Sequence, residues 1–223
     1  MNKETVLKAE DVAKTYHPGN VSVEAVQGIS LSIEEGEHVS IVGPSGCGKS
    51  TLLYLLGALI TPTSGRVIIN GIPTENLKDR DLTGLRRKSI GFVFQQFNLI
   101  PTLTARANLG IATRLRGMAA GDEICRYLQL VGLEDKMDRR PNELSVGEQQ
   151  RVSIARALVC NPAVILADEP TGSLDSKTSR GIMELLTKLN RENGRTLIIV
   201  THNKKIAGMA GRVLHMLDGK IKG

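Results

Sequence analysis

Aromatic side chains and cysteine are scarce in this chain of 223 residues. Aromatics make up 3% and tryptophan is absent, so the stacking platforms that bind single-stranded nucleic acid are largely missing. The three cysteines are odd in number and widely spaced, which disfavours a disulfide framework or a zinc site. We expect no nucleic-acid partner and three reduced thiols, at Cys47, Cys125 and Cys160.

Long hydrophobic runs are also absent. The longest, Leu52–Ile60, has nine residues, whereas a membrane-spanning helix needs about 18 or more. The amino-terminal sequence M-N-K-E-T-V-L-K-A-E mixes acids with lysines and lacks the apolar core of a signal peptide. These features predict a cytoplasmic location. The net charge of +6 comes from basic residues interspersed with acids, which favours a solvated basic face, helped by nearby acidic headgroups.

One segment is instead rich in glycine and matches the phosphate-binding pattern G-x-x-x-x-G-K-[ST]. The preceding run, Glu37–Val42, predicts a buried strand, and Thr51–Leu59 is apolar nearly all round, which predicts a helix buried between layers. A strand, a glycine-rich loop and a helix in this order aim backbone N–H groups and a helix N-terminus at phosphate. The segment is Gly43-Pro44-Ser45-Gly46-Cys47-Gly48-Lys49-Ser50-Thr51.

Two carboxylates follow a second apolar strand, Val164–Ala167. Successive residues at a strand end point in different directions. Asp168 can therefore face a Mg²⁺ ion together with the hydroxyl of Ser50, while Glu169 polarises an attacking water. Lys49 supplies a cation for the β- and γ-phosphates. Together these residues predict hydrolysis of a nucleoside triphosphate.

The periodicity of the remaining chain predicts an α/β fold in which strands alternate with helices, and hence a parallel sheet covered on both faces. Residues 98–160 lack β-branched runs and predict a helical insertion. Three strands favour a small antiparallel sheet beside the core. The predicted strands are 5–16, 23–35, 65–71, 90–94, 164–167 and 196–200; the predicted helices are 82–88, 104–116, 121–131, 147–160 and one through Ile182, Leu185, Leu186 and Leu189.

A capping box opens the third helix of the insertion, where Ser145 is a plausible N-cap and Glu148 lies three residues later. The sequence L-S-V-G-E-Q-Q-R around it resembles the signature motif, usually L-S-G-G-Q, of the ABC (ATP-binding cassette) ATPases. The phosphate loop, L-A-D-E-P-T, S-L-D (173–175) and V-T-H (200–202) occur in the order and spacing of that family. The resemblance runs from residue 5 to 219.

Two segments, Ile90–Leu99 and Leu166–Gly172, are similar to the branch that contains the lipoprotein-releasing, macrolide-exporter and cell-division-associated ATPases. The resemblance implies one ABC ATPase domain over 1–223, built on a P-loop NTPase core with a parallel sheet. An antiparallel β subdomain belongs with that core (1–97 and 161–223), and a helical subdomain is inserted at 98–160.

The resemblance also implies residue roles. Tyr16 stacks on adenine, Gln95 reaches Mg²⁺ and the water with Gln96 as the runner-up, and His202 bonds the γ-phosphate. Asp175 couples two sites across a dimer. The nucleotide is further contacted by Gly43, Ser45, Gly46, Cys47, Gly48, Lys49, Ser50 and Thr51, with Cys47 as a small filler residue.

The family further implies a homodimer in which Ser145 and Gly147 of one subunit close over ATP held by the other. This dimer is expected to power export, or the extraction of a lipoprotein or other substrate, by separately encoded transmembrane permease subunits, which hold it at the inner face of the cell membrane. The alternative function is that of an ATP-driven regulatory switch, which moves a membrane partner without transport. A DNA-repair or translation ATPase is disfavoured, because the chain has neither long coiled-coil arms nor a second cassette.

Three positions depart from the family pattern. Val146 replaces a glycine, so we expect helical or extended backbone there, with Gly147 making the close approach. Glu148 replaces glutamine and adds a negative charge near ATP. Ala107 stands where the branch commonly has an acid, which bears on docking to the membrane partner.

Overall fold

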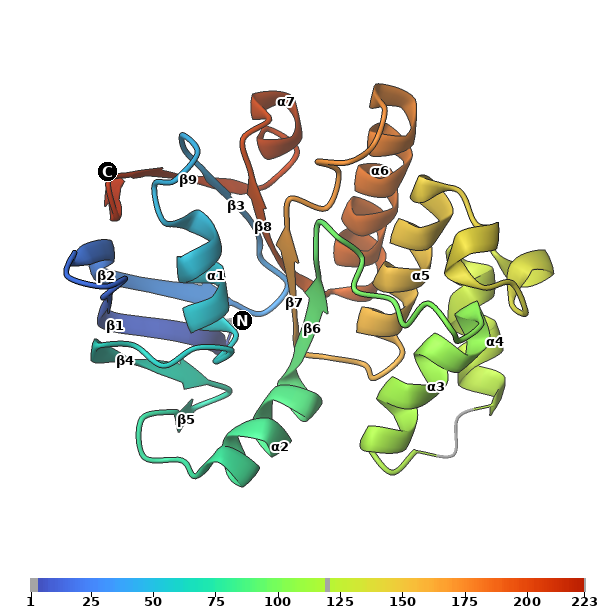
Figure 1. Cartoon of the computed structure of the whole chain (residues 1–223), viewed down its shortest axis with the longest axis horizontal. Helices are drawn as coiled ribbons and strands as arrows, with labels where there is room; N and C mark the ends of the chain where they lie inside the picture. The colour runs from blue at the N-terminus through green and yellow to red at the C-terminus, as the bar shows by residue number, and fades with distance from the viewer. Residues whose placement is uncertain (1–3, 119–120, 223) are drawn as a thin grey trace.

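The computed structural model describes residues 4–118 and 121–222 and contains two β-sheets with helices between and around them (Figure 1). Residues 1–3, 119–120 and 223, which the predicted domain boundaries include, lie outside the described residues. Helices α1 and α2 lie nearer the antiparallel sheet, and α3 to α6 form the opposite side of the molecule. This mixed α/β architecture confirms the predicted fold class.

The smaller sheet has the strand order β2-β1-β4-β5. All its pairs are antiparallel, as the sequence predicts for the sheet that contains β1, β2 and β4. The strand predicted at 65–71 ends earlier, because Asn70 and Gly71 have positive φ values of 49° and 75° and turn the chain back. The two-residue strand after this turn is not predicted from the sequence. The bounds are β1 (Thr5–Tyr16), β2 (Val23–Glu34), β4 (Ser64–Ile69) and β5 (Ile72–Pro73).

The larger sheet has the order β10-β9-β3-β8-β7-β6, and all its pairs are parallel except β10 with β9. The last two strands form a hairpin that the periodicity does not predict. Its turn is Asp218-Gly219, with φ values of 46° and 76°, and an Asp-Gly pair is a recognised hairpin signal. The bounds are β3 (His38–Val42), β6 (Ile90–Val93), β7 (Val164–Asp168), β8 (Thr196–Thr201), β9 (Arg212–Leu217) and β10 (Lys220–Lys222).

Both faces of the parallel sheet are covered, which explains why its central strands are apolar throughout. In β7, Val164 and Leu166 belong to the core shared with the antiparallel sheet, whereas Ile165 and Ala167 belong to the core under the helices on the other face. Such two-sided burial turns the usual alternating pattern into a continuous hydrophobic run.

Helix α1 (Lys49–Leu56) lies between the two sheets, as predicted (Figure 1). Leu52, Leu53, Leu55 and Leu56 are completely buried, on several sides of the helix. The helix ends three residues before its predicted end, because Gly57 is its C-cap and Ala58 has a positive φ of 52°.

The described residues between 98 and 160 contain helices and no strand, and the three predicted helices are present there. The subdomain boundaries themselves stay a prediction. None of the helices in 4–118 and 121–222 is long and apolar enough to cross a membrane. The helices are α2 (Asp79–Ser89), α3 (Ala105–Leu115), α4 (Gly121–Leu130), α5 (Val146–Leu158), α6 (Ser176–Asn193) and the unpredicted α7 (Lys204–Ala207), with short 3₁₀ turns η1 (Glu134–Lys136) and η2 (Pro141–Glu143).

One titratable group is buried at the start of β3. His38 is 6% exposed and its Nε2 has no hydrogen-bond partner. Burial, and secondarily the positive charge of Arg191, lowers the pKa of His38 to about 4. The folded protein therefore holds this imidazole neutral at pH values where the unfolded chain protonates it.

Because the folded pKa lies below the unfolded value, the stability that neutral His38 contributes is present above about pH 6.5 and is lost as the pH falls toward 4. When the pH is lowered from 7.5 to 4.5, we expect the free energy of unfolding to fall less for His38→Leu than for the wild type. The difference between the two losses is at most about 3 kcal/mol. Urea denaturation at both pH values measures this difference. The exposed His17→Gln variant is the control, and equal losses in all three proteins would contradict the prediction.

Candidate functional site

The glycine-rich loop connects β3 to α1 and approaches neighbouring backbone closely. At Gly48, which has a φ of 96°, an added Cβ would lie 2.0 Å from the carbonyl oxygen of Ala25. At Gly43 it would lie 2.1 Å from the carbonyl oxygen of Met216. Only glycine fits these two positions. The loop therefore presents its backbone N–H groups at the N-terminus of α1, as phosphate binding requires.

Lys49 is buried, and its ammonium donates hydrogen bonds within the loop to the carbonyl oxygens of Gly43 at 3.0 Å and Pro44 at 2.8 Å. Cys47 is also buried, with its sulfur 3.9 Å from the same ammonium. The loop thus holds one positive charge at its centre, beside the N-terminus of α1.

Asp168, at the end of β7, faces α1 and accepts two hydrogen bonds. Ser50 Oγ donates to its Oδ1 at 2.9 Å, and the Tyr54 hydroxyl donates to its Oδ2 at 2.8 Å. The sequence predicts that Ser50 and Asp168 lie together, and the structure brings the two side chains into contact. The sequence analysis does not predict the contact of Tyr54 with Asp168, although Tyr54 lies one helical turn after Ser50 and so on the same face of α1.

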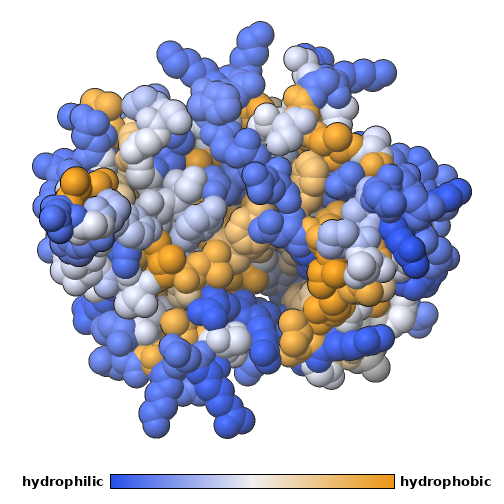
Figure 2. Space-filling view, in the orientation of Figure 1, coloured by the Kyte–Doolittle hydropathy of each residue, from blue (hydrophilic) through white to orange (hydrophobic). Residues whose placement is uncertain are grey.

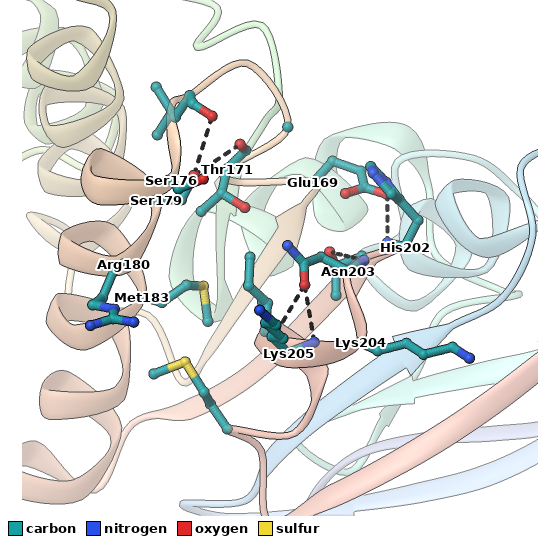
Figure 3. A pocket seen from close by; sticks show the side chains of 15 residues that line it. Glu169, Thr171, Ser176, Ser179, Arg180, Met183, His202, Asn203, Lys204 and Lys205 are labelled. Atoms are coloured by element: carbon teal, nitrogen blue, oxygen red, sulfur yellow. Dashed lines mark hydrogen bonds and ion pairs between the residues drawn. The ribbon is translucent and has the colours of Figure 1, made fainter.

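Glu169 lies on the other side of the strand end and faces His202 (Figure 3). Its Oε1 accepts a hydrogen bond from the His202 backbone N–H at 3.0 Å and lies 2.8 Å from His202 Nδ1. Glu169 has a positive φ of 45°, which is strained for a residue with a side chain. Its backbone N–H is bonded to the Val200 carbonyl at 2.9 Å, which holds this conformation.

A cleft of about 430 Å³ brings most of the predicted nucleotide and catalytic residues together. Gln95 lines it, whereas the alternative Gln96 does not. Gly43, Cys47 and Asp168 are not among the residues that line it. Tyr16 also lies outside the lining, at the end of β1, where the residue is 40% exposed and the Lys14 ammonium lies 5.4 Å from its ring centroid. The lining residues are Ala25, Ser45, Gly46, Gly48, Lys49, Ser50, Thr51, Gln95, Glu169 and His202.

The capping box at the start of α5 is formed as predicted. Ser145 Oγ accepts from the Glu148 N–H at 3.4 Å, and Glu148 Oε2 accepts from the Ser145 N–H at 2.9 Å. Val146 is helical, which confirms the expectation for this departure. The close approach of Gly147 is to α6, since an added Cβ would lie 2.5 Å from Thr178 Cγ2.

The extra negative charge of Glu148 is neutralised within the chain. Lys136 forms an ion pair with Glu148 Oε1, and this contact, followed by the Ser145 backbone hydrogen bond, lowers the pKa of Glu148. The negative charge that glutamate brings to this position is therefore paired with the positive charge of Lys136.

Ser145 and Gly147 line a second cleft, of about 840 Å³, which shares no lining residue with the first. Asp175 also lines it and caps α6, accepting from the backbone N–H groups of Lys177 at 2.9 Å and Thr178 at 3.0 Å. The Thr178 hydroxyl, first among several hydrogen bonds, lowers the pKa of Asp175. One chain thus carries both parts of the predicted composite site at different places.

One further contact joins the helix that carries Ser145 to the segment that carries Glu169. The Gln150 side chain is completely buried in α5, and its Nε2 donates to the carbonyl oxygen of Pro170 at 2.8 Å. Pro170 follows Glu169 directly. The sequence by itself does not predict this contact.

Comparison with known proteins identifies the family and supports the fold. Residues 26–172 match the model of the ABC transporter family. The chain belongs to that family. It is 49% identical to an uncharacterised ABC transporter ATP-binding protein of Methanocaldococcus jannaschii, covering 97% of this chain and 95% of the relative. A solved dimeric structure of an ATP-binding cassette in a post-hydrolysis state, bound to ADP and Pi, is 47% identical, with a TM-score of 0.90 and 97% of each chain covered.

Two relatives with more specific names are almost as similar. The lipoprotein-releasing system ATP-binding protein LolD of Geobacter metallireducens is 44% identical, over 97% of this chain and 98% of its own length. The macrolide export ATP-binding/permease protein MacB of Brucella melitensis is 45% identical over 97% of this chain, which spans 34% of that longer protein. The present ABC chain is accordingly an ATP-binding and ATP-hydrolysing subunit of a transport complex.

Removal of the loop cation tests the phosphate site. We expect Lys49→Ala to weaken ATP binding roughly 10-fold or more, because hydrogen bonds from a charged donor to phosphate are lost. Titration calorimetry measures the affinity, with the exposed Lys78→Ala as the matched control. An unchanged dissociation constant for Lys49→Ala would contradict the assignment of the loop.

Proposed function

We propose that this ABC subunit hydrolyses ATP as a head-to-tail homodimer, in which each ATP lies between the phosphate loop of one subunit and the Ser145 helix of the other. One observation carries the proposal: the phosphate cleft and the cleft that contains Ser145 are both well formed but share no lining residue. A second copy in the arrangement of the solved cassette dimer supplies the missing half of each site.

We infer that Mg²⁺ accompanies ATP. The Ser50 hydroxyl and the Asp168 carboxylate, 2.9 Å apart, are the hard oxygen donors that this ion prefers, and Gln95 lines the phosphate cleft together with Ser50. Among the described residues, no three His, Cys, Asp or Glu side chains form a metal-binding group. The protein then supplies few ligands, and phosphate oxygens and water supply the others. When bound, the ion neutralises phosphate charge during transfer.

We assign the remaining roles in ATP binding and hydrolysis to Glu169, His202, Lys49 and Tyr16. Glu169 holds the attacking water and accepts its proton at Oε1 or Oε2, while its contact with His202 fixes the carboxylate. His202, whose side chain is 69% exposed, offers the other ring nitrogen to the γ-phosphate. Lys49 leaves its carbonyl partners for the β- and γ-phosphates, and Tyr16 stacks on adenine.

The chain drives a membrane partner through a groove of about 290 Å³ that is lined by residues of α2, β6, α3 and α5. We name it the apolar groove. Figure 2 displays apolar side chains gathered in the middle of this face, between the two halves of the molecule. Three of the lining residues are arginines and most of the others are apolar. The partner segment that fits this lining is a helix with an apolar face and an acidic residue. The groove is lined by Arg87, Ile90, Gly91, Phe92, Phe94, Ile111, Ala112, Leu115, Arg116, Arg156, Ala157 and Cys160.

LolD and MacB, as their names state, belong to a lipoprotein-releasing system and to macrolide export. We accordingly infer that the partner is a separately encoded transmembrane subunit and that the complex exports or extracts an amphiphilic substrate. The cassette is then peripheral on the inner face of the cell membrane.

Glu169→Gln keeps the shape of the side chain and removes its charge. We expect ATP hydrolysis to fall roughly 100-fold or more, since a general base contributes about that much. ATP then remains bound, and the dimer becomes detectable by size-exclusion chromatography with ATP and Mg²⁺. The exposed Glu75→Gln is the control. Turnover close to that of the wild type would exclude Glu169 as the base.

Mixing two inactive variants tests the composite site. Lys49→Ala disables the loop and Ser145→Arg blocks the cap, so a mixed dimer contains one site with neither change. We expect the mixture to hydrolyse ATP faster than the sum of the two separate proteins. Circular dichroism verifies that both variants fold. A mixture with no more activity than that sum would contradict a site shared between subunits.

A further inference from the structure

Two hydroxyl groups donate hydrogen bonds to Asp168, and only one of them belongs to a proposed cation ligand. Ser50, at Oδ1, is itself one of the proposed cation ligands, whereas the Tyr54 hydroxyl, at Oδ2, forms no second hydrogen bond among the described residues. The Tyr54 hydroxyl is partly buried, and its O–H can only donate to a carboxylate oxygen, so this hydrogen bond fixes the orientation of the carboxylate.

The ring of Tyr54 is in turn packed against an aromatic pair. Its centroid lies 6.5 Å from that of Phe94 at an interplanar angle of 55°, and Phe94 stacks on Phe92 at 5.5 Å and 11°. Phe92 and Phe94 both line the apolar groove, while Gln95, the next residue, lines the phosphate cleft. A continuous series of contacts thus runs from the groove to Asp168.

We propose that Tyr54 is a positioning residue that holds Asp168 for the cation and ties the orientation of this carboxylate to the aromatic wall of the apolar groove. A partner segment seated in the groove displaces Phe94, and the Tyr54 ring follows because it is packed against the Phe94 ring. The hydrogen bond then transmits the displacement to Asp168. This inference rests on the proposed function, in which Asp168 is a cation ligand.

The hydroxyl is tested by Tyr54→Phe, which keeps the ring and its contact with Phe94. The control is Tyr127→Phe on α4, which packs in the helical core away from the cleft. The midpoint of Mg²⁺ stabilisation of the ATP complex is measured by thermal shift, and ATP affinity is measured separately in EDTA. We expect Tyr54→Phe to need about 5- to 10-fold more Mg²⁺ with unchanged affinity in EDTA, as loss of one hydrogen bond predicts.

Asp168→Asn distinguishes failure of this inference from failure of the proposed site. If Asp168→Asn raises the Mg²⁺ midpoint but Tyr54→Phe behaves like Tyr127→Phe, the role of Tyr54 is overturned and the metal assignment stands. If Asp168→Asn leaves the midpoint unchanged, both are overturned. A loss of ATP affinity in EDTA for Tyr54→Phe would indicate a structural role in the loop and would also overturn the inference.

The link to the groove is tested by a double-mutant cycle of Tyr54→Phe and Phe94→Leu on the same Mg²⁺ midpoint. Phe94→Leu alone is expected to raise it, and the double variant is expected to add little beyond Tyr54→Phe, because both changes act through one hydrogen bond. Thermal midpoints without ligand report any loss of folding. Independent, multiplicative effects would contradict transmission through the two rings.

Discussion

Strands β3, β8 and β7 run parallel and end at one edge of the sheet, and the polar residues of the phosphate cleft depend on that common edge. The register pairs Val42 with Thr201 and Asp168 with Val200. The phosphate loop starts one residue after Val42, His202 directly follows Thr201, and Glu169 directly follows Asp168. Backbone hydrogen bonds therefore fix three distant segments of the chain within reach of one ligand, and the continuous apolar burial on both faces holds the strands in place.

Helix α1 is held in a fixed position relative to these strand ends, so its N-terminus is fixed relative to the ligand. Because its leucines are buried between the two sheets, its N-terminus cannot move relative to the strand ends without opening the core. The glycines of the loop meet backbone atoms of Ala25 and Met216, which belong to the antiparallel sheet and to β9. The strained backbone of Glu169, which costs of the order of 1–3 kcal/mol, is stabilised by the hydrogen bonds of its backbone N–H to Val200 and of its carbonyl oxygen with the Gly172 N–H.

The start of α5 illustrates how local departures from a family motif are accommodated. Val146 takes a helical conformation that any residue adopts, so the missing glycine leaves no strain. Gly147 is needed for the contact with Thr178, and the charge of Glu148 is matched by Lys136. The cap at Ser145 is intact and exposed in a cleft of its own, which is the physical basis for assigning its ligand to a second subunit.

Local sequence determined the elements that depend on short-range chemistry: the glycine loop, the capped helix α5, the central apolar strands and the two carboxylates at the end of β7. It also indicated the family, since five motifs in order leave little freedom. Tertiary structure decided what depends on contacts between distant residues. Two of these contacts join side chains, Tyr54 with Asp168 and Lys136 with Glu148, and the third joins the Gln150 side chain to the backbone carbonyl of Pro170. In none of them do the neighbouring residues in sequence indicate the partner. The periodicity does not predict the hairpin of β9 and β10, because its strands are short and partly exposed, and β9 joins the sheet only by pairing with β3.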